Sequence, residues 1–160
     1  MDGTFEAYSR SRWSALVRTA YLLTGNLSGS EDFAQDTLVR LYRVWSRRGH
    51  DIISIDAYAH RILINLVNRR GRQRSREVLL PNVPDSQTHP VDDSLREELR
   101  SSLLQLPPKM RAVVVLRFYA QLSVHETAVT LRCAEGTVKS HTSEALRRLR
   151  GIIEMGEVAQ

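Results

Sequence analysis

Apolar residues recur every three or four positions along most of the chain, which is the spacing of α-helices that bury one face. No alternation of apolar and polar residues lasts long enough to indicate a strand. The pattern therefore predicts an all-α protein. The first helix is expected to run from Phe5 to Leu23. Its buried face is expected to hold Trp13, Leu16, Val17, Ala20 and Leu23.

Turn residues and capping patterns divide the first half of the chain into three helices. A glycine–asparagine pair ends the first helix, and the S-x-x-E pattern from Ser28 to Glu31 predicts a capping box for a second helix that ends near Trp45. A loop over residues 47–54 leads to a third helix, which Asp56 is expected to cap. The inward residues of these two helices are predicted to be Ala34, Leu38, Leu41, Trp45, Tyr58, Ile62 and Leu66.

A stretch rich in proline and polar residues separates two helical units. It follows the third helix, and its composition cannot bury much apolar surface, which is typical of a flexible linker. We therefore expect a first helical domain over residues 1–77, a linker over 78–93 and a second helical domain over 94–160.

The second unit has the spacing of a helix-turn-helix. Leucines recur from residue 95 to 106, Pro107-Pro108 then breaks the chain, and a further helix runs through Phe118. A second capping box from Ser123 to Glu126 opens a short helix, and a turn leads to a last helix from Thr137 to about residue 153. Two short helices joined in this way form a helix-turn-helix, whose second helix enters the major groove of DNA.

The outward face of the last helix carries hydrogen-bonding and cationic groups and no large apolar side chain, as a surface that contacts base edges requires. These residues are Thr137, Lys139, Ser140, His141, Ser143, Glu144, Arg147 and Arg148. Glu144 is the exception, because phosphate repels a carboxylate. It either accepts from a cytosine amine or pairs with Arg148 one turn later, and the spacing favours the second. A hairpin of two helices with a solvated polar face is the alternative that the pattern leaves open.

The net charge of +5 rests on 23 basic against 18 acidic residues, and only Lys109 and Lys139 among the basic ones are lysines. The planar guanidinium suits phosphates and base edges, which favours nucleic acid as a partner. A GC-rich genome would produce the same bias without any function. Five of the arginines lie within residues 69–76, at the end of the third helix.

Several classes of protein are disfavoured by the composition. Cys133 is the only cysteine, so an internal disulfide is excluded and a reducing compartment is expected. No export signal and no apolar run of about 20 residues is visible, so we expect a cytoplasmic protein without a membrane partner. The histidines are scattered, and no glycine-rich phosphate loop occurs, so we expect no metal, no cofactor and no enzymatic activity.

Four separated segments resemble, in order, the sigma-70 family of transcription initiation factors, in its compact extracytoplasmic-function (ECF) group. Residues 22–38 resemble the segment that binds core RNA polymerase, and residues 57–65 with the arginine run resemble the minus-10 recognition segment. Residues 106–117 and 135–150 resemble the domain that binds the minus-35 element. The resemblance covers about residues 5–153 and implies a sigma factor that directs RNA polymerase to promoters.

The resemblance also implies partners and site residues. Core RNA polymerase would be bound through its beta-prime clamp and beta flap, promoter DNA at two elements, and an anti-sigma factor would cover the same surfaces. The loop over residues 47–54 would capture an unstacked promoter base, whereas Trp45 and Tyr58 are expected to pack in the core. The residues implied for the clamp are Asp32, Gln35, Asp36 and Arg40. Those for the minus-10 strand are Arg61, Asn65, Arg69, Arg70 and Arg72, and those for the minus-35 element are Thr137, Lys139, Ser140, His141, Arg147 and Arg148.

The sequence departs from the family pattern around the helix-turn-helix. Arg132 stands where a turn glycine is common, Ala134 where a capping serine is common, and His141 and Glu144 where basic residues are common. Two other interpretations therefore stay open. One is a regulator of the LuxR type, whose helix-turn-helix resembles residues 136–141 but which leaves residues 1–92 unexplained. The other is a polymerase-binding interaction protein without promoter-opening activity.

Overall fold

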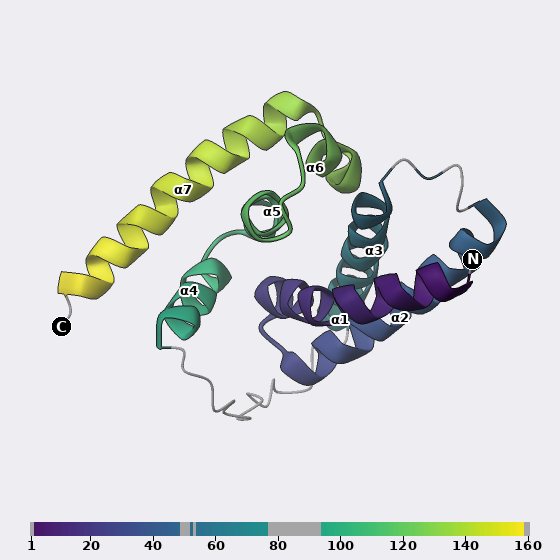
Figure 1. Ribbon diagram of the computed structural model, residues 1–160. Coiled ribbons are helices and arrows are strands. Elements are labelled where there is room, and N and C mark those ends of the chain that lie inside the picture. The colour runs from purple at the N-terminus through teal and green to yellow at the C-terminus, as the bar shows by residue number, and fades with distance from the viewer. Residues whose placement is uncertain (1, 49–51, 53, 77–93, 159–160) are drawn as a thin grey trace. The chain divides into compact units, whose positions relative to one another are not determined.

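The structure, a computed structural model, describes residues 2–48, 52, 54–76 and 94–158 (Figure 1). Within these ranges the regular secondary structure is helical, and no strand occurs, so the all-α prediction is confirmed. The chain divides into two compact units, Met1–Ser86 and Gln87–Gln160. Most of the predicted linker, over residues 78–93, lies outside the described residues.

The first unit consists of three helices that pack against one another. They are α1 (Asp2–Thr24), α2 (Leu27–Arg48) and α3 (Ile55–Arg76). Helix α2 packs against both α1 and α3 (Figure 1). The shared core holds Leu16, Ala20, Phe33, Ala34, Leu41, Ala59 and Leu63. The periodicity predicted the buried positions Leu16, Ala20, Ala34 and Leu41. On α3 the predicted Tyr58, Ile62 and Leu66 are only half-buried and pack against the core, while Ala59 and Leu63 take its buried positions.

Two helix starts in the first unit differ from the prediction. Helix α2 begins at Leu27, and the Asn26 side chain accepts a hydrogen bond from the backbone N of Gly29 at 3.0 Å. Ser28 therefore lies inside the first turn, and the predicted capping box is wrong. Helix α3 begins at Ile55, and Ser54 Oγ accepts from the backbone N of Ala57 at 3.2 Å. In both cases an acceptor two residues before the predicted one takes the capping position.

Trp13 also differs from the prediction of a buried residue. Its side chain is 38 % exposed, whereas Leu16, one turn later on the same helix, is 1 % exposed. Trp13 lies at the edge of the contact between α1 and α2, where it lines a surface groove. A helical pattern shows which side of a helix faces inward, but the partner helix covers only part of that side.

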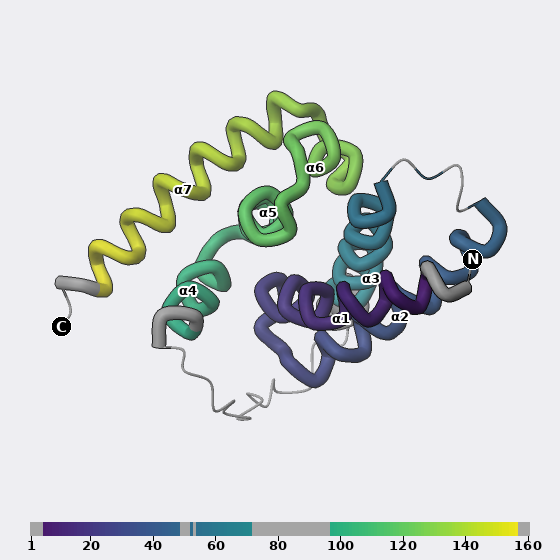
Figure 2. Tube along the Cα trace, in the orientation of Figure 1, coloured from purple at the N-terminus to yellow at the C-terminus, as the bar shows by residue number. Residues whose placement is uncertain are grey.

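The second unit contains α4 (Ser94–Leu104), α5 (Pro108–Val114), the π-helical turn η2 (Val115–Tyr119), α6 (Val124–Leu131) and α7 (Glu135–Val158). The chain passes from α5 through α6 into the long helix α7, against which α4, α5 and α6 all pack (Figure 2). The buried residues of the second unit include Leu103, Leu106, Val113, Leu116, Ala128, Val138, Ala145 and Leu149. Leu99, in α4, is 47 % exposed.

Arg111 joins the end of α4 to α5 through its guanidinium group. Its Nε donates to the carbonyl of Leu103 at 3.0 Å, and its Nη2 donates to the carbonyls of Leu104 and Leu106 at 3.1 and 3.0 Å. The last carbonyls of a helix have no partner within the helix. Arg111 supplies these partners, and its partial burial lowers the pKa of the guanidinium. The side chain thereby holds α4 against the helix-turn-helix unit.

Candidate nucleic-acid and polymerase interfaces

The helix-turn-helix predicted from the sequence is present in the second unit. Ser123 Oγ accepts from the backbone N of Glu126 at 3.0 Å, and the Glu126 carboxylate accepts from the backbone N of Ser123 at 2.9 Å. This is the predicted capping box, and it opens α6. Helix α7 begins at Glu135, two residues earlier than predicted, and the carbonyl of Ala134 accepts from the backbone N of Thr137 and Val138.

The turn between α6 and α7 places Arg132 in the left-handed region, at φ 56° and ψ 47°. Its backbone N donates to the carbonyl of Val129, and the next amide, that of Cys133, donates to the carbonyl of Ala128 at 3.0 Å. A residue with a β-carbon adopts this conformation at a cost of about 1–2 kcal/mol. Cys133 packs beside the small core of Val113, Ala128 and Val138, which supports a packing role.

The outward face of α7 is mostly polar over its first four turns. Leu146 is the exception, since its side chain is 44% exposed, so the prediction that this face holds no large apolar side chain is wrong at that position. Val138, Ala145 and Leu149 are buried on the inner side, as predicted. On the other side the exposed residues are Lys139, Ser140, Ser143, Arg147 and Arg148, while Thr137, His141 and Glu144 are half-buried. We call this set the recognition face. It places all six residues predicted for the minus-35 element on a single helix.

Glu144 lies at the centre of the recognition face and binds both neighbouring arginines. Its two carboxylate oxygens accept from Arg147 Nη2 at 2.6 and 2.5 Å, and its Oε1 accepts from Arg148 Nε at 3.1 Å. The hydrogen bonds from Arg147 and then from Arg148 lower the pKa of Glu144, so the carboxylate is ionised at neutral pH. The pairing with Arg148 was predicted, but the contact with Arg147 was not.

The predicted minus-10 residues lie on two sides of α3. With about 100° of rotation per residue, Arg61 and Asn65 share one side, whereas Arg70 lies about 180° from Arg61. Arg70 accordingly faces α2, and its guanidinium carbon is 6.0 Å from the centre of the Phe33 ring. Asn65 and Arg69 are exposed and Arg61 is half-buried, while the side chain of Arg72 lies outside the described residues.

Asn68 was not among the residues assigned to the minus-10 strand from the sequence. It is exposed and lies on the same side of α3 as Arg61 and Asn65, because seven residues complete almost two helical turns. Its carboxamide can donate to and accept from a base edge. The helical spacing from Arg61 was the signal that could have identified it.

The four predicted clamp residues of α2 all point to solvent. Asp32, Gln35, Asp36 and Arg40 are exposed. Asp32, Asp36 and Arg40 follow one another at intervals of four residues with Gln35 beside them, so the four form one polar strip. Beside this strip lies an apolar groove of about 400 Å³ between α1 and α2. Its lining comprises Phe5, Ser9, Trp13, Gln35, Leu38, Val39, Tyr42 and Arg43. Gln35 belongs to both, so the polar strip and the groove form one continuous surface.

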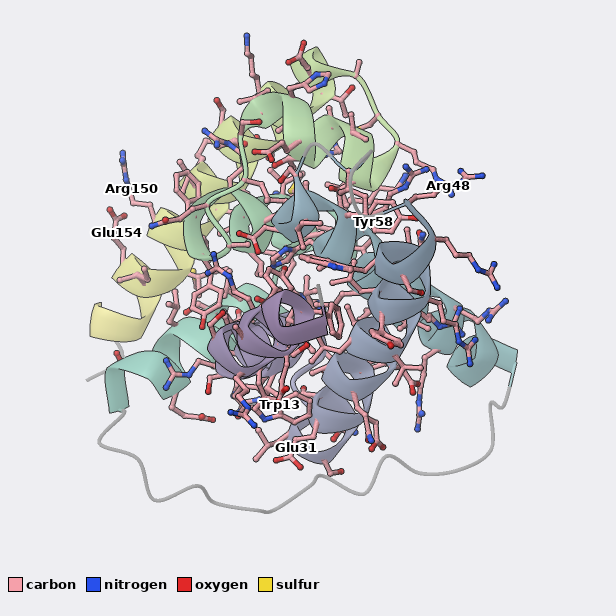
Figure 3. The ribbon with its side chains drawn as sticks, turned by 45° about the vertical axis from the view of Figure 1, so that its right-hand side comes forward. Trp13, Glu31, Arg48, Tyr58, Arg150 and Glu154 are labelled. Carbon is pink, nitrogen blue, oxygen red and sulfur yellow. The ribbon has the colours of Figure 1, made fainter. Side chains whose placement is uncertain are left out.

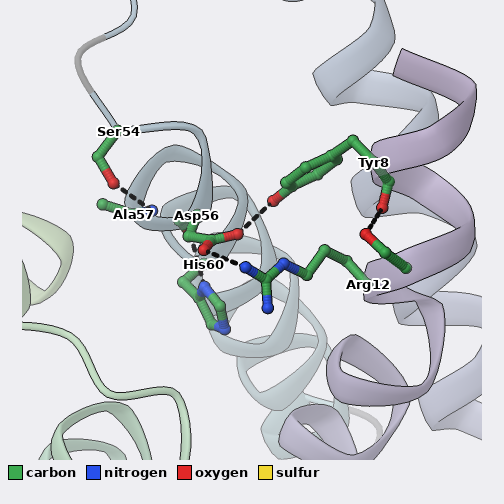
Figure 4. A network of polar contacts seen from close by, with 7 residues as sticks. Tyr8, Arg12, Ser54, Asp56, Ala57 and His60 are labelled. Carbon is green, nitrogen blue, oxygen red and sulfur yellow. Dashed lines mark hydrogen bonds and ion pairs between the residues drawn. The ribbon is translucent and has the colours of Figure 1, made fainter. Parts of the chain in front are cut away.

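A polar network fixes the start of α3 against α1 (Figure 4). Tyr8 Oη donates to Asp56 Oδ1 at 2.8 Å, and Arg12 Nη2 donates to Asp56 Oδ2 at 3.0 Å. The backbone carbonyl of Asp56 contacts His60 Nδ1 at 2.6 Å, and His60 is a buried residue. Burial raises the pKa of the Tyr8 phenol above its ordinary value, and the hydrogen bond to Asp56 raises it further. Asp56 therefore ties two helices together instead of capping α3.

The predicted loop over residues 47–54 is described only at its two ends and at residue 52. Arg47 and Arg48 are exposed at the end of α2, and Figure 3 shows Arg48 projecting from the helix. Residues 49–51 and 53 lie outside the described residues. Trp45 is half-buried, with its ring centre 5.4 Å from that of Phe5 and 6.0 Å from that of Tyr8. Tyr58 packs against the core of the first unit. Both aromatic residues thus take part in packing, as expected.

The described part of the chain holds no group of three or more His, Cys, Asp or Glu side chains that could bind a metal ion. Among the helices that the structure describes, none has the length and apolar character that crossing a membrane requires.

Comparison with known proteins gives concordant matches over both units. The family model described as Sigma-70 region 2 matches residues 6–77, and the one described as Sigma-70, region 4 matches residues 102–151. The RNA polymerase sigma-E factor of Streptomyces avermitilis is 39% identical over 156 residues, which cover 94% of this chain and 85% of that protein. The ECF RNA polymerase sigma factor SigE of Mycolicibacterium smegmatis is 34% identical over 169 residues, covering 93% and 64%.

Solved structures show the same architecture. The sigma factor RpoE of Bartonella quintana, in complex with the anti-sigma factor NepR, superposes with a TM-score of 0.77 at 26% identity, covering 94% of this chain and 97% of that one. CnrH in complex with the cytosolic domain of CnrY gives a TM-score of 0.73 at 20% identity, covering 97% and 90%. At that identity the second match supports the fold alone.

Proposed function

The chain belongs to the sigma-70 family of transcription initiation factors, in its ECF group, and from this premise we propose how its two helical units divide the work. The protein is a sigma factor that binds core RNA polymerase and directs transcription to promoters. One observation carries this conclusion: both sigma-70 regions match in order along one chain, and relatives with the same name are 39% identical over more than nine tenths of it.

We propose that the first unit binds core polymerase through α2. The polar strip of Asp32, Gln35, Asp36 and Arg40 would contact the beta-prime clamp, because all four side chains are exposed on one side of a helix that buries its other side. The adjoining apolar groove would enlarge this contact by burying Trp13 and Tyr42, which are 38 % and 45 % exposed. The beta flap would bind the second unit.

The same unit would hold one strand of the minus-10 element along α3. Arg61, Asn65, Arg69, Arg70 and Arg72 were assigned to this strand from the sequence, and Asn68 joins them by its position. Asparagine can bond a base edge, and arginine can contact the backbone or stack on a base. Arg70 is exposed and its guanidinium also lies over the Phe33 ring, so we propose that it contributes mainly through this packing.

The second unit would place α7 in the major groove of the minus-35 element. Thr137, Lys139, Ser140, His141, Arg147 and Arg148 are the residues assigned to DNA, and the recognition face presents them together. Residues 1–77, 78–93 and 94–160 are proposed as first domain, linker and second domain. A linker of about 15 residues would hold the second domain at high local concentration near its DNA element once the first domain is bound.

An anti-sigma factor is the regulatory partner we propose. Both of the solved structures described above are complexes with another protein, and one of these partners is named as an anti-sigma factor. We further propose that the protein acts in the cytoplasm, uses no cofactor and catalyses no reaction itself, since RNA synthesis belongs to the polymerase.

Run-off transcription tests the proposed function. Bacterial core polymerase is assayed with and without this protein on a library of genomic promoter fragments. Specific transcripts that depend on the protein are expected, and their start sites define the minus-10 and minus-35 sequences. Stable polymerase binding without transcripts would indicate an interaction protein. Sequence-specific duplex binding without any polymerase binding would indicate a LuxR-type regulator, although that interpretation leaves the match over residues 6–77 unexplained.

A further inference from the structure

Glu144 occupies a position in α7 from which it can contact a base pair. It lies nine residues after the first residue of the helix, Glu135, in the third turn. Ser140 precedes it by about 6 Å along the axis, on the same outward side. The carboxylate side chain is 30% exposed because Arg147 and Arg148, which are 75% and 49% exposed, lie over it. An ionised carboxylate therefore stands on the surface that faces DNA in the proposed complex.

The carboxylate determines which chemical groups can lie opposite it. Being ionised, it accepts hydrogen bonds and cannot donate one. In the major groove only cytosine N4 and adenine N6 are donors, whereas guanine and thymine present acceptors. Adenine also presents the acceptor N7 next to its amine, which a carboxylate would repel. Cytosine is thus the base that Glu144 fits best.

The arginine next to Glu144 matches the partner base. Arg148 donates to Glu144 through Nε at 3.1 Å. This contact does not use the two terminal nitrogens of the guanidinium, which can therefore donate to a base. A terminal pair of this kind fits O6 and N7 of guanine in a bidentate contact. One acid and one arginine, already joined, therefore present the acceptor and the two donors that a single cytosine–guanine pair requires.

We propose that Glu144 is a specificity-determining residue: together with Arg148 it selects one cytosine–guanine pair of the minus-35 element, the carboxylate accepting from cytosine N4 and the guanidinium donating to guanine O6 and N7. Arg147 also binds Glu144 and holds the carboxylate in place. In the proposed complex it would add positive charge near the DNA phosphates. The inference rests on the proposed function, because it needs α7 to lie in the major groove of a promoter.

The test compares holoenzymes reconstituted with the full chain on a promoter library whose minus-35 region is randomised. Glu144→Gln removes the charge and leaves a carboxamide, which can both donate and accept. Glu154→Gln makes the same change two to three turns later on α7, where the side chain projects from the helix (Figure 3), and serves as the matched control. Thermal unfolding of each variant verifies that the helix-turn-helix is intact.

We expect the native protein and Glu154→Gln to select cytosine–guanine at one shared position. Glu144→Gln should lose that preference by between about 5-fold and about 150-fold while every other position keeps its own. A uniform rise in affinity for all sequences, with a steeper dependence on salt, would overturn the inference, because Glu144 would then only repel phosphate. An unchanged base profile would overturn it as well. If the native holoenzyme selects no minus-35 base at all, the proposed contact of α7 itself fails, and that result is distinct from the other two.

Discussion

At the scale of single residues, the turn of the helix-turn-helix carries a conformation that its side chain does not favour. Arg132 has φ 56°, in the region where glycine is the ordinary residue. The hydrogen bonds around it require this conformation, because the amides of Arg132 and Cys133 both return to carbonyls of α6. The departure from the family pattern noted at this position therefore changes stability more than it changes the path of the chain.

Arg132→Gly should stabilise the second unit by about 0.5–1 kcal/mol, the relief of strain being partly offset by the greater freedom of glycine in the unfolded chain. The free energy of unfolding can be followed by circular dichroism in urea. Trp13 and Trp45, the two tryptophans of the chain, lie in the first unit, so their fluorescence separates its transition from that of the second. Arg150→Gly is the control, and it should destabilise the exposed helix by about 1 kcal/mol. A loss of stability in Arg132→Gly would show that the arginine side chain outweighs the strain.

Tyr8 should make the stability of the first unit depend on alkaline pH. Its pKa is raised in the folded protein, by burial first and by the hydrogen bond to Asp56 second. The folded state therefore keeps the phenol protonated where the unfolded chain loses the proton. The stabilisation is complete below the ordinary pKa of about 10 and is lost as pH rises above it.

The measurement for Tyr8 is the urea midpoint of tryptophan fluorescence between pH 8 and pH 11. The native protein should lose stability above about pH 10, and Tyr8→Phe should lose less, because phenylalanine has no proton to release. Tyr21→Phe provides the comparison within the same helix. Equal slopes for the native protein and Tyr8→Phe would mean that other groups cause the alkaline loss.

At the scale of helices, periodicity and caps predicted most of the fold but not its exceptions. The capping box of Ser123 and Glu126 was visible because both partners are local in sequence. The π-helical turn η2 was not visible in the sequence. It is defined by the backbone N of Ala120 donating to the carbonyl of Val115, five residues earlier, and no residue type marks such a hydrogen bond. Asn26, and not the predicted Ser28, caps α2. Both residue types cap helices, and the local pattern does not show which of the two takes that position.

The site residues, too, could be predicted where spacing within one helix decides their position, and not where packing between helices decides it. On α7 the spacing predicted which polar residues lie on the outward side, because one helix places its residues by spacing alone, but it did not predict the exposed Leu146 beside them. On α3 the run of arginines did not show which side of the helix each residue occupies. Arg70 points toward Phe33, whereas Asn65 points away from the core. The apolar groove beside α2 could not be predicted, because the exposure of Val39 and Tyr42 depends on how far α1 extends over them.

The geometry of α3 leads to a prediction about promoter opening. Replacing Arg69, Arg70 and Arg72 together with alanine should impair opening and spare polymerase binding, because the clamp residues lie on α2. Among single changes, Asn65→Ala should reduce opening by about 5-fold to 10-fold, whereas Arg70→Ala should mainly lower the stability of the first unit by about 0.5–1 kcal/mol. Permanganate reactivity of unpaired thymines measures opening, and co-purification measures polymerase binding. If the triple variant no longer binds polymerase, the assignment of α3 to DNA is wrong.

At the scale of the whole molecule, positive charge is distributed unequally. Residues 1–77 hold 13 basic and 8 acidic side chains, an excess of 13 − 8 = 5, and residues 93–160 hold 10 and 8, an excess of 2. The unit proposed to hold the opened strand thus carries most of the electrostatic attraction to DNA. Contacts of this kind weaken as salt rises. The second unit must then depend more on base contacts and on being held close to its element.

That dependence can be tested by severing the proposed linker. A protease site inserted within residues 78–93 allows the intact holoenzyme to be assembled first and the chain to be cut afterwards. If the linker supplies a high local concentration, cutting should reduce transcription from promoters that need both elements by at least about 10-fold. Promoters that need only the minus-10 element should be nearly unaffected, and the same variant without protease is the control. Equal transcription before and after cutting would mean that polymerase alone holds the second unit in position, and that the linker contributes no affinity of its own.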